Sequence, residues 1–371
     1  MLASASTQEL TDGVVAGSRS AISRAITLIE STRIDHRSRA RELLQHLPSP
    51  ELPATRVGIS GVPGVGKSTF IESLGRLLTS TGHRVGVLAV DPSSARTGGS
   101  VLGDRTRMPK LTADPAAYVR PSPTAGTLGG VTRATAQAIT ILESAGYDVI
   151  LVETVGVGQS EIAVAGMVDT FLLLGLARTG DQLQGIKKGV LEIADVVAIN
   201  KADGDRVVEA SAAARELTGA LHLVHGKGTA WVPPVLTCSG LSGDGVEQVW
   251  SMCLRHAEHL GGEGLHRKRS RQQWDMAWAL VREELLQRLE RSPAVREHRG
   301  AVRDAVLGGS LGAAQAADEI LAAFDGAAPQ ETGSSAPVSD PTVSDATVSD
   351  ATVSDATVSG APVPEAAIVD E

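Results

Sequence analysis

One segment of the sequence has the residue types and the spacing that bind phosphate. It reads GVPGVGKS from Gly61 to Ser68 and follows a short β-branched run, RVGIS. Glycines allow backbone turns that direct several N–H groups at one phosphate, and a helix beginning after the loop would direct its dipole there too. Lys67 supplies a compact cation for the β- and γ-phosphate oxygens, and Ser68 supplies a hydroxyl for Mg²⁺. The residues expected to contact the nucleotide here are Gly61, Val62, Pro63, Gly64, Val65, Gly66, Lys67, Ser68 and Thr69.

A second motif, NKAD from Asn200 to Asp203, ends the apolar run ADVVAIN and indicates which base is bound. The carboxylate of Asp203 can accept hydrogen bonds from the N1–H and the 2-amino group of guanine, whereas adenine would turn a lone pair towards it. Each such bond contributes about 1.5–3 kcal/mol, so the motif predicts GTP rather than ATP. The amide of Asn200 can brace the loop, and the stem of Lys201 can lie over the base. The later loop TCSGLSGDG can offer backbone N–H groups to the guanine oxygen from Ser239, Gly240 and Leu241.

Acidic residues lie where two other expected strands end. Asp91 follows the run RVGVLAV, and Glu153 ends the run YDVILVE. Ligands of parallel sheets bind at the carboxyl ends of strands, and Mg²⁺ prefers a few carboxylates with phosphate oxygens and water. Glu153 is therefore placed to hold the metal or its waters, and the N–H of Gly156 can sense the γ-phosphate. Asp104 lies further along the Gly/Ser/Arg-rich loop after Asp91. The alternatives are a helix cap or turn residue at Asp91, a solvated loop acid at Asp104 and a surface acid at Glu153.

Two charged segments have more than one interpretation. In ARTGDQLQGIKKG, the residues Asp181, Lys187 and Lys188 can reach the nucleotide or a partner, or can begin a solvated helix. The basic run HRKRSR, residues 266–271, can contact a partner, although a solvated helix start is the simpler interpretation. The sequence alone leaves these alternatives open.

The elements that must position these motifs are short β-branched runs that alternate with helical stretches. The runs begin at Arg56, Arg84, Tyr147, Asp169, Ala194 and Val232, and several are apolar on both faces. Parallel strands covered by helices on both sides have this pattern. The sequence therefore predicts an α/β, doubly wound domain with a mostly parallel sheet over residues 53–262.

Extensions are expected on both sides of that domain. Residues 1–52 have helical spacing at Ile22, Ile26 and Ile29, and again at Leu43, Leu44 and Leu47. The tail, residues 327–371, repeats VSDAT and contains no aromatic residue. Such a segment cannot bury enough apolar area to offset its ordering entropy, so it is expected to be disordered.

Between the domain and the tail, residues 263–326 are expected to form a helical arm. An apolar stripe there has the spacing of one helix face: Trp274, Trp278, Val281, Leu285 and Leu289. A second helical stretch runs from about Ala301 to Phe324. The stripe suits either a partner surface or a helix docked on its own domain.

Composition excludes several classes of protein. The 371 residues carry a net charge of -9, which argues against binding nucleic acid or an anionic membrane. The two cysteines, Cys238 and Cys253, provide no disulfide framework or cysteine-rich metal site. No apolar signal core begins the chain, and no apolar run approaches the ~20 residues that span a bilayer. We therefore expect a cytoplasmic protein.

The motifs resemble those of the MeaB/ArgK/MMAA family of P-loop GTPases. The resemblance is carried, in order, by GVPGVGKSTF, VDPSSARTGGSVLGDRTRM, ETVGVGQSE, GDQLQGIKKG and NKAD, and it spans roughly Ser18 to Phe324. It implies a GTPase that serves as a chaperone of an adenosylcobalamin-dependent acyl-CoA mutase, chiefly methylmalonyl-CoA mutase. Such a chaperone gates cofactor loading and protects the mutase. The resemblance also implies a homodimer formed through C-terminal helices.

The same resemblance implies roles for individual residues. The residues expected to act in catalysis are Lys67, Glu153 and the switch-loop residue Lys187. The residues expected to hold Mg²⁺ are Ser68, Asp91, Asp104 and Glu153. Glu153 stands where common small GTPases have the Asp of D-x-x-G, as it does in this family. Gln159 is not adjacent to Gly156, so the group that positions the attacking water is left unassigned.

Three other functions share parts of this pattern. A nickel-delivery GTPase would carry a His-rich tract or a Cys cluster near its start, whereas this chain has the sparse pairs His222/His225 and His256/His259. A small-molecule or protein kinase would bind ATP and would not need NKAD. A nucleotide-gated interaction protein would use hydrolysis as a slow timer, which the chaperone interpretation includes.

Overall fold

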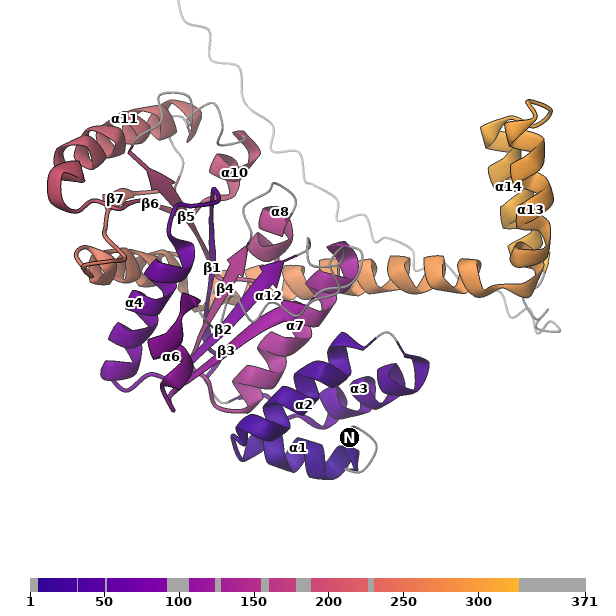
Figure 1. The fold of residues 1–371 in the computed structure, drawn as a ribbon, viewed down its shortest axis with the longest axis horizontal. Helices are drawn as coiled ribbons and strands as arrows, with labels where there is room; N and C mark the ends of the chain where they lie inside the picture. The colour runs from indigo at the N-terminus through magenta and orange to yellow at the C-terminus, as the bar shows by residue number, and fades with distance from the viewer. Residues whose placement is uncertain are drawn as a thin grey trace, which may run out of the picture. The chain divides into compact units, whose positions relative to one another are not determined.

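Seven strands form one sheet, described by a computed structural model that covers residues 6–31, 33–50, 52–91, 107–123, 128–154, 160–177, 188–225 and 230–326. The strand order is β3-β2-β4-β1-β5-β6-β7, and every neighbouring pair is parallel (Figure 1). The strands are β1 Thr55–Gly61, β2 Val85–Asp91, β3 Ala117–Pro123, β4 Val149–Thr154, β5 Thr170–Leu176, β6 Val196–Asn200 and β7 Val235–Thr237. The predicted α/β, doubly wound fold is confirmed.

Helices cover both faces of this sheet. One face is covered by α4 (Lys67–Ser80), α6 (Pro109–Ala113) and the first part of α12 (Val246–Arg291). The other is covered by α7 (Leu128–Ser144), α8 (Ser160–Ala165), α10 (Lys188–Ile193) and α11 (Val207–His225), which follows the short helix η2 (Gly204–Arg206). Alternate residues of β5 pack on opposite faces of the sheet. Leu172 packs on the face covered by α4, and Phe171 and Leu173 pack on the face covered by α7. The strands are therefore apolar on both faces because both faces are covered.

Three of the described helices precede the sheet: α1 (Thr7–Val15), α2 (Arg19–Glu30) and α3 (Ile34–His46). Ser6 and Glu9 form a capping box that begins α1. Of the residues selected by helical spacing, Ile22, Ile26, Ile29 and Leu43 are buried and share a core with α7, and Leu44 and Leu47 are partly buried against this core. Figure 1 shows α2 and α3 beside α7. The N-terminal helices thus extend the core on one side of the sheet.

The strand β3 was not predicted from the sequence. Its residues, AYVRPSP, include two prolines, and it lies at the edge of the sheet beside β2. An edge strand tolerates proline because it need not donate every N–H to a neighbour. Its Arg120 pairs with Glu30 of α2 at 2.5 Å, so this edge also holds the N-terminal helices.

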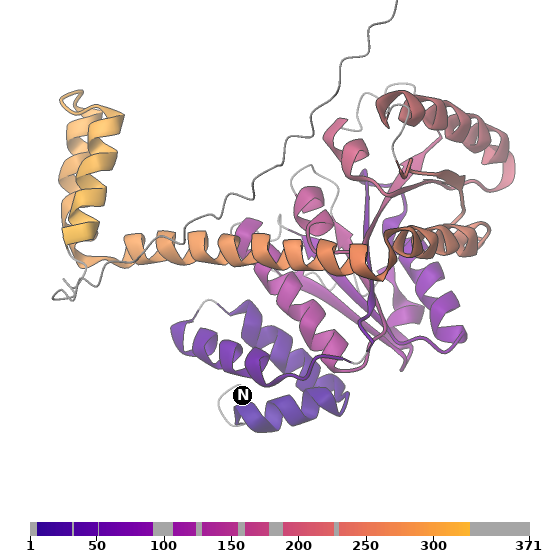
Figure 2. The same cartoon turned by 180° about the vertical axis from the view of Figure 1, so that it is seen from behind.

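The long helix α12 is interrupted at Gly261, whose backbone is not helical (φ 65°, ψ 170°). Glycine adopts a positive φ without strain, and this break adjoins the predicted domain boundary at residue 262. The first part of α12 buries Val249 and Cys253 against the sheet. From here on, the arm means residues 262–291 only, the part of α12 that follows the break, and not the whole helical stretch expected over residues 263–326. Figure 2 shows the two helical stretches on either side of the break.

The chain divides into two compact units, Met1–Glu297 and His298–Glu371. The second contains most of α13 (Pro293–Leu307) and all of α14 (Ala313–Gly326). The sequence predicted one helical stretch from Ala301, but glycines at 308 and 309 separate two helices there, with φ 75° at Gly309. The predicted disordered tail, residues 327–371, lies outside the described residues. None of the described helices is long and apolar enough to cross a membrane.

Candidate nucleotide-binding site

The predicted motifs meet at the carboxyl edge of the sheet. A cavity of about 660 Å³ lies there, beside the loop after β1 and the ends of β2 and β4. Its lining includes Pro63, Gly64, Gly66, Lys67, Ser68, Thr69, Glu153 and Lys201. These residues come from three separate sequence motifs, and the parallel strand order brings them together because adjacent strands end at the same edge.

The loop between β1 and α4 depends on glycine at its last position. Gly66 caps α4 with φ 97° and ψ 29°, a left-handed conformation that few residues other than glycine adopt. A Cβ at this position would also lie 2.8 Å from Nδ2 of Asn200. Because α4 begins at Lys67, its first N–H groups and the positive end of its dipole lie at the cavity. This geometry suits a bound phosphate.

Lys67 is buried, and its ammonium is bonded to the loop that carries it. Nζ donates to the carbonyl of Gly61 at 2.7 Å and to that of Val62 at 3.4 Å. Burial lowers the pKa of Lys67, while the carboxylates of Glu153 and Glu161 act in the opposite direction. Backbone carbonyls are neutral acceptors, so phosphate oxygens can replace them with stronger, charge-assisted hydrogen bonds.

A hydroxyl and a carboxylate lie side by side next to this loop. Ser68 Oγ donates to Glu153 Oε1 at 3.1 Å, and Glu153 is 8% exposed. The neighbouring Thr154 donates to Ser60 of β1 at 2.8 Å, which fixes the end of β4 against β1. Oxygen donors of this kind are the ligands that Mg²⁺ prefers. The residues present therefore fit a Mg²⁺ ion held between Ser68, Glu153 and the phosphates.

The end of β6 is bonded to two loops at once. Asn200 Nδ2 donates to the carbonyl of Val65 at 2.9 Å, and its Oδ1 accepts from the N–H of Gly240 at 2.9 Å. The amide therefore braces the phosphate loop, which is the role that the sequence suggested. Lys201 is the one non-glycine residue in the described ranges with a positive φ, 62°, and its Nζ donates to the carbonyl of Gly64 at 2.7 Å. The NKAD motif and the phosphate loop thus form one hydrogen-bonded unit.

Asp203 is oriented by a buried hydroxyl. Ser239 Oγ donates to Asp203 Oδ2 at 2.5 Å, and Ser239 is fully buried. The N–H groups of Ser239 and Gly240 donate within the protein, to the carbonyl of Asp244 at 2.8 Å and to Asn200. Of the three residues expected to offer an N–H to the guanine oxygen, Leu241 therefore remains the best placed.

Several predicted site residues lie outside the described residues. They are Asp104, Gly156, Gln159, Asp181 and Lys187. For Asp91 the structure describes only the backbone. Asp91 is the last residue of β2 and directly follows Val90, which pairs with Thr154 of β4. Asp91 therefore ends its strand at the same edge of the sheet as Glu153.

Two further charged residues belong to this site and were not selected from the sequence. Arg107 lines the cavity, and its charge lowers the pKa of Lys67. Glu161 is buried, and its charge raises that pKa. Both residues lie within the sequence segments on which the family resemblance is based, GDRTRM and ETVGVGQSE. Their place in these segments was the sequence feature that could have identified them as site residues.

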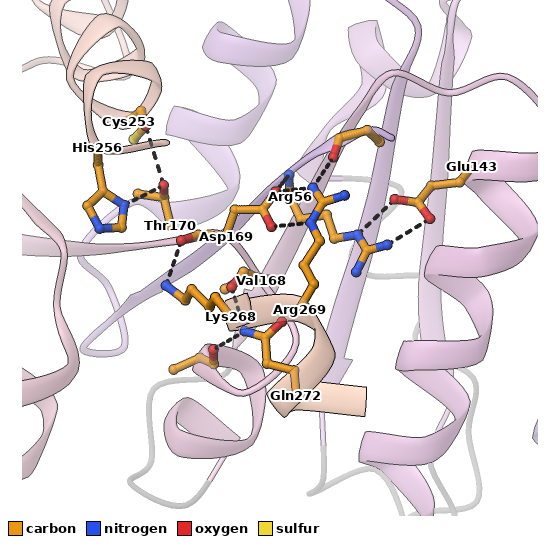
Figure 3. Close-up of polar contacts among 12 residues, drawn as sticks. Arg56, Glu143, Val168, Asp169, Thr170, Cys253, His256, Lys268, Arg269 and Gln272 are labelled. Carbon is orange, nitrogen blue, oxygen red and sulfur yellow. Dashed lines mark hydrogen bonds and ion pairs between the residues drawn. The ribbon is translucent and has the colours of Figure 1, made fainter. Parts of the chain in front are cut away.

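The opposite, amino edge of the sheet carries a second polar cluster (Figure 3). Asp169, directly before β5, accepts from Arg269 Nε at 2.8 Å and Nη2 at 2.6 Å, and from the backbone N–H of Arg56 at 2.9 Å. Lys268 Nζ donates to the carbonyl of Asp169 at 2.6 Å. These contacts attach the arm to the sheet. The interpretation of HRKRSR as a solvated helix start was therefore wrong for Lys268 and Arg269.

One of the histidine pairs considered for metal delivery is engaged in packing. Nδ1 of His256 lies 2.9 Å from Thr170 Oγ1, and Nε2 lies 3.3 Å from Asp195 Oδ1. Burial lowers the pKa of His256. The ring of Trp231 lies 5.1 Å from those of both His256 and His259. These contacts give the pair a structural role at the amino edge.

Three features of this structure define the class of P-loop GTPases. They are a parallel sheet, a glycine-rich phosphate loop at the start of α4, and an NKAD motif bonded to that loop. Comparison with known protein families gives the particular family. The model of the family described as Methylmalonyl Co-A mutase-associated GTPase MeaB matches residues 22–294. The chain belongs to this family, and the resemblance seen in the sequence motifs is confirmed.

Individual relatives agree with this assignment. A protein of Mycobacterium tuberculosis named as a probable GTPase is 56% identical over 326 residues, covering 86% of this chain and 97% of the relative. The Mus musculus protein named methylmalonic aciduria type A homolog, mitochondrial, is 48% identical over 324 residues, covering 84% and 78%. A crystal structure of an LAO/AO transport system kinase has a TM-score of 0.67 at 33% identity, covering 86% and 97%. This protein is a GTP hydrolase related to methylmalonyl-CoA mutase-associated GTPases.

Proposed function

We propose that this protein is a Mg²⁺-dependent GTPase that acts as a chaperone of an adenosylcobalamin-dependent acyl-CoA mutase of the methylmalonyl-CoA mutase type. In that role it gates cofactor loading and protects the mutase from inactivation. The main support is a guanine-reading motif bonded to a phosphate loop, in a member of a family named for its association with that mutase. A nucleotide can control such a partner if the partner binds the GTP and GDP forms differently.

In this proposal the phosphate side of the site does the chemistry. Lys67 exchanges the carbonyl of Gly61 for β- and γ-phosphate oxygens, and the start of α4 binds the same phosphates. Ser68 and Glu153 hold Mg²⁺, together with Asp91 and Asp104. When bound, Mg²⁺ neutralises the charge on the β- and γ-phosphate oxygens. Gly156 and Lys187 belong to the segments that respond to the γ-phosphate.

The base side of the site selects guanine. Asp203 is the acceptor for the N1–H and the 2-amino group, and the hydroxyl of Ser239 holds its carboxylate in place at 2.5 Å. A carboxylate oxygen has two lone pairs, so Oδ2 can keep this bond while the group also accepts from guanine. Lys201 covers the base, and Leu241 donates its N–H to the guanine oxygen.

We also propose a homodimer that uses the arm. Trp274 and Trp278 are 63% and 49% exposed, and their rings form an edge-to-face pair 6.0 Å apart. Val281 and Leu285 continue this exposed face, and exposed apolar stripes of this kind are typical of interfaces. Light scattering on the full chain should give the mass of two copies. Replacing both tryptophans by serine should give the mass of one, and an unchanged mass would place the interface elsewhere.

The mutase role is tested by calorimetric titration of a purified methylmalonyl-CoA mutase. The protein is loaded with GDP in one arm and with a non-hydrolysable GTP analogue in the other, and the two affinities should differ. Lys187→Ala should reduce that difference more than it weakens GTP binding. Equal affinities, together with a GTPase rate that the mutase does not change, would contradict the chaperone role and leave the GTPase assignment in place.

A further inference from the structure

A second cavity, of about 310 Å³, lies between α7 and the arm and shares no lining residue with the nucleotide cavity. Apolar side chains form much of its wall, including Ile139 of α7, Met167 before β5, and Met276 and Leu280 of the arm. Sites for small molecules are typically clefts of about 300–1,000 Å³ with mostly apolar walls and a few polar groups. The size and the lining of this cavity match a small molecule with an apolar body.

Two arginines on this wall are already paired. Arg56 donates to Glu143 through Nε at 2.7 Å and Nη2 at 2.8 Å, and Arg269 pairs with Asp169 at 2.6 Å (Figure 3). Each guanidinium group has a carboxylate of its own, so this part of the wall carries no unbalanced charge. It suits the apolar part of a ligand.

A smaller adjoining cavity, of about 140 Å³, has different chemistry. It shares Arg133, Gln137 and Leu280 with the larger one and is also lined by Arg37 of α3. Arg37 donates through Nη1 to Gln287 Oε1. The guanidinium groups of Arg37 and Arg133 lie 3.5 and 3.8 Å from the same Glu283 oxygen, farther than the ~2.7–2.9 Å of a charge-assisted hydrogen bond. The Nε atom of each arginine is buried and has no hydrogen-bond partner among the described residues.

Positive charge exceeds negative charge around the smaller cavity. Three arginines, Arg37, Arg41 and Arg133, form ion pairs there with two carboxylates, Glu283 and Glu284. Burial, and then repulsion from Arg133, lowers the pKa of Arg37. Guanidinium groups nevertheless stay protonated in proteins, so a bound anion would relieve this repulsion. Their planar shape matches a carboxylate, which can accept two hydrogen bonds from one group.

We propose that the two cavities together bind a small carboxylic acid with an aliphatic chain. The carboxylate lies between Arg37 and Arg133, and the chain lies along Met167, Met276 and Leu280. Because α3 and α7 supply the arginines while the arm supplies two of the apolar contacts, the bound acid ties the arm to the rest of its unit. This inference does not rest on the proposed function, since no nucleotide is needed for binding.

Hexanoate is a suitable probe, with the full-length protein labelled with ¹³C in its methionine methyl groups. The chain has five methionines, and two of them, Met167 and Met276, line the larger cavity. Titration with hexanoate and no nucleotide should shift the signals of these two and leave those of Met108 and Met252 in place. Acetate lacks the chain, and 1-hexanol lacks the charge, so both should bind at least about tenfold more weakly than hexanoate.

Two variants test the contributions of the arginine charge and of the cavity volume separately. Arg133→Gln removes the charge and should weaken hexanoate binding about ten- to a hundredfold, while Leu280→Trp should fill the larger cavity and remove the shifts. Arg215→Gln, at an exposed position of α11, is the matched control and should bind like the unmodified protein. If a variant fails to fold, the comparison of hexanoate with 1-hexanol on the unmodified protein still decides. Equal affinities for these two probes, or unmoved signals of Met167 and Met276, would overturn the proposal.

Discussion

The two edges of the sheet use acidic residues for different purposes. At the amino edge, Asp148, Asp169 and Asp195 stand directly before β4, β5 and β6. Each accepts a hydrogen bond from a backbone N–H near the start of a neighbouring strand, at 2.7, 2.9 and 2.8 Å respectively. The ion pairs of Asp169 and Asp195 with the arm add to these bonds. Acids in this position fix strands and helices to one another.

At the carboxyl edge, acidic residues stand at or after the ends of strands. Glu153 lies near the end of β4 and Asp203 follows β6, and each is hydrogen-bonded to a serine hydroxyl, at 3.1 Å and 2.5 Å. A hydroxyl leaves the charge of a carboxylate available for a metal or a base, whereas a guanidinium partner neutralises it. The position of an acid relative to the strand direction therefore separates the proposed ligand-binding residues from structural ones.

The largest effect on activity is expected from Lys67→Ala, which acts on the carboxyl edge alone. It removes the cation of the phosphate loop, and loss of one such group typically lowers a rate by about 10²–10³-fold. Thermal unfolding should change little, because Nζ of Lys67 bonds to carbonyls of its own loop. Single-turnover GTP hydrolysis is the measurement, with Lys110→Ala, at an exposed position of α6, as the control. Unchanged turnover in Lys67→Ala would show that this loop is not the phosphate site.

The largest effect on stability is expected from Asp169→Asn at the amino edge. It leaves the buried guanidinium of Arg269 without its counter-charge, and breaking a buried ion pair costs about 3–5 kcal/mol. Urea unfolding should show this loss, while the affinity for GTP stays the same. The control is Glu263→Gln, whose pair with Arg267 is exposed and worth at most about 1 kcal/mol. A loss of GTP affinity with unchanged stability would remove the distinction between the two edges.

Local motifs were predictable from the sequence because their chemistry depends on neighbouring residues. The phosphate loop and NKAD are such motifs, and the long apolar strands that position them were also recognised. The edge strand β3 was missed because two prolines and Arg120 interrupt its apolar pattern. Its pairing with β2 decides its structure, and pairing between distant segments leaves little signal in a local window.

Contacts between distant segments explain the other omissions. Arg269 meets Asp169, and Arg37 and Arg133 meet Glu283, across long separations in the chain. A basic run such as HRKRSR has the composition of a solvated surface, and only the folded structure shows that two of its members are bonded to the sheet. No sequence motif marks the second cavity, because its lining residues come from three distant segments: α3, α7 and the arm.

The smallest of the three effects is a change of base preference in Asp203→Asn. Losing a hydrogen bond between guanine and a charged group costs about 1.5–3 kcal/mol, which corresponds to roughly ten- to a hundredfold in GTP affinity. The oxygen of the new amide can keep the hydrogen bond from Ser239, so its NH₂ group can donate to the 2-oxo group of xanthine. The variant should therefore bind xanthosine triphosphate better than GTP. Competition between the two nucleotides, measured by calorimetry, tests this, with Asp205→Asn at an exposed position nearby as the control. If the unmodified protein bound ATP and GTP equally, Asp203 would not be the group that reads the base.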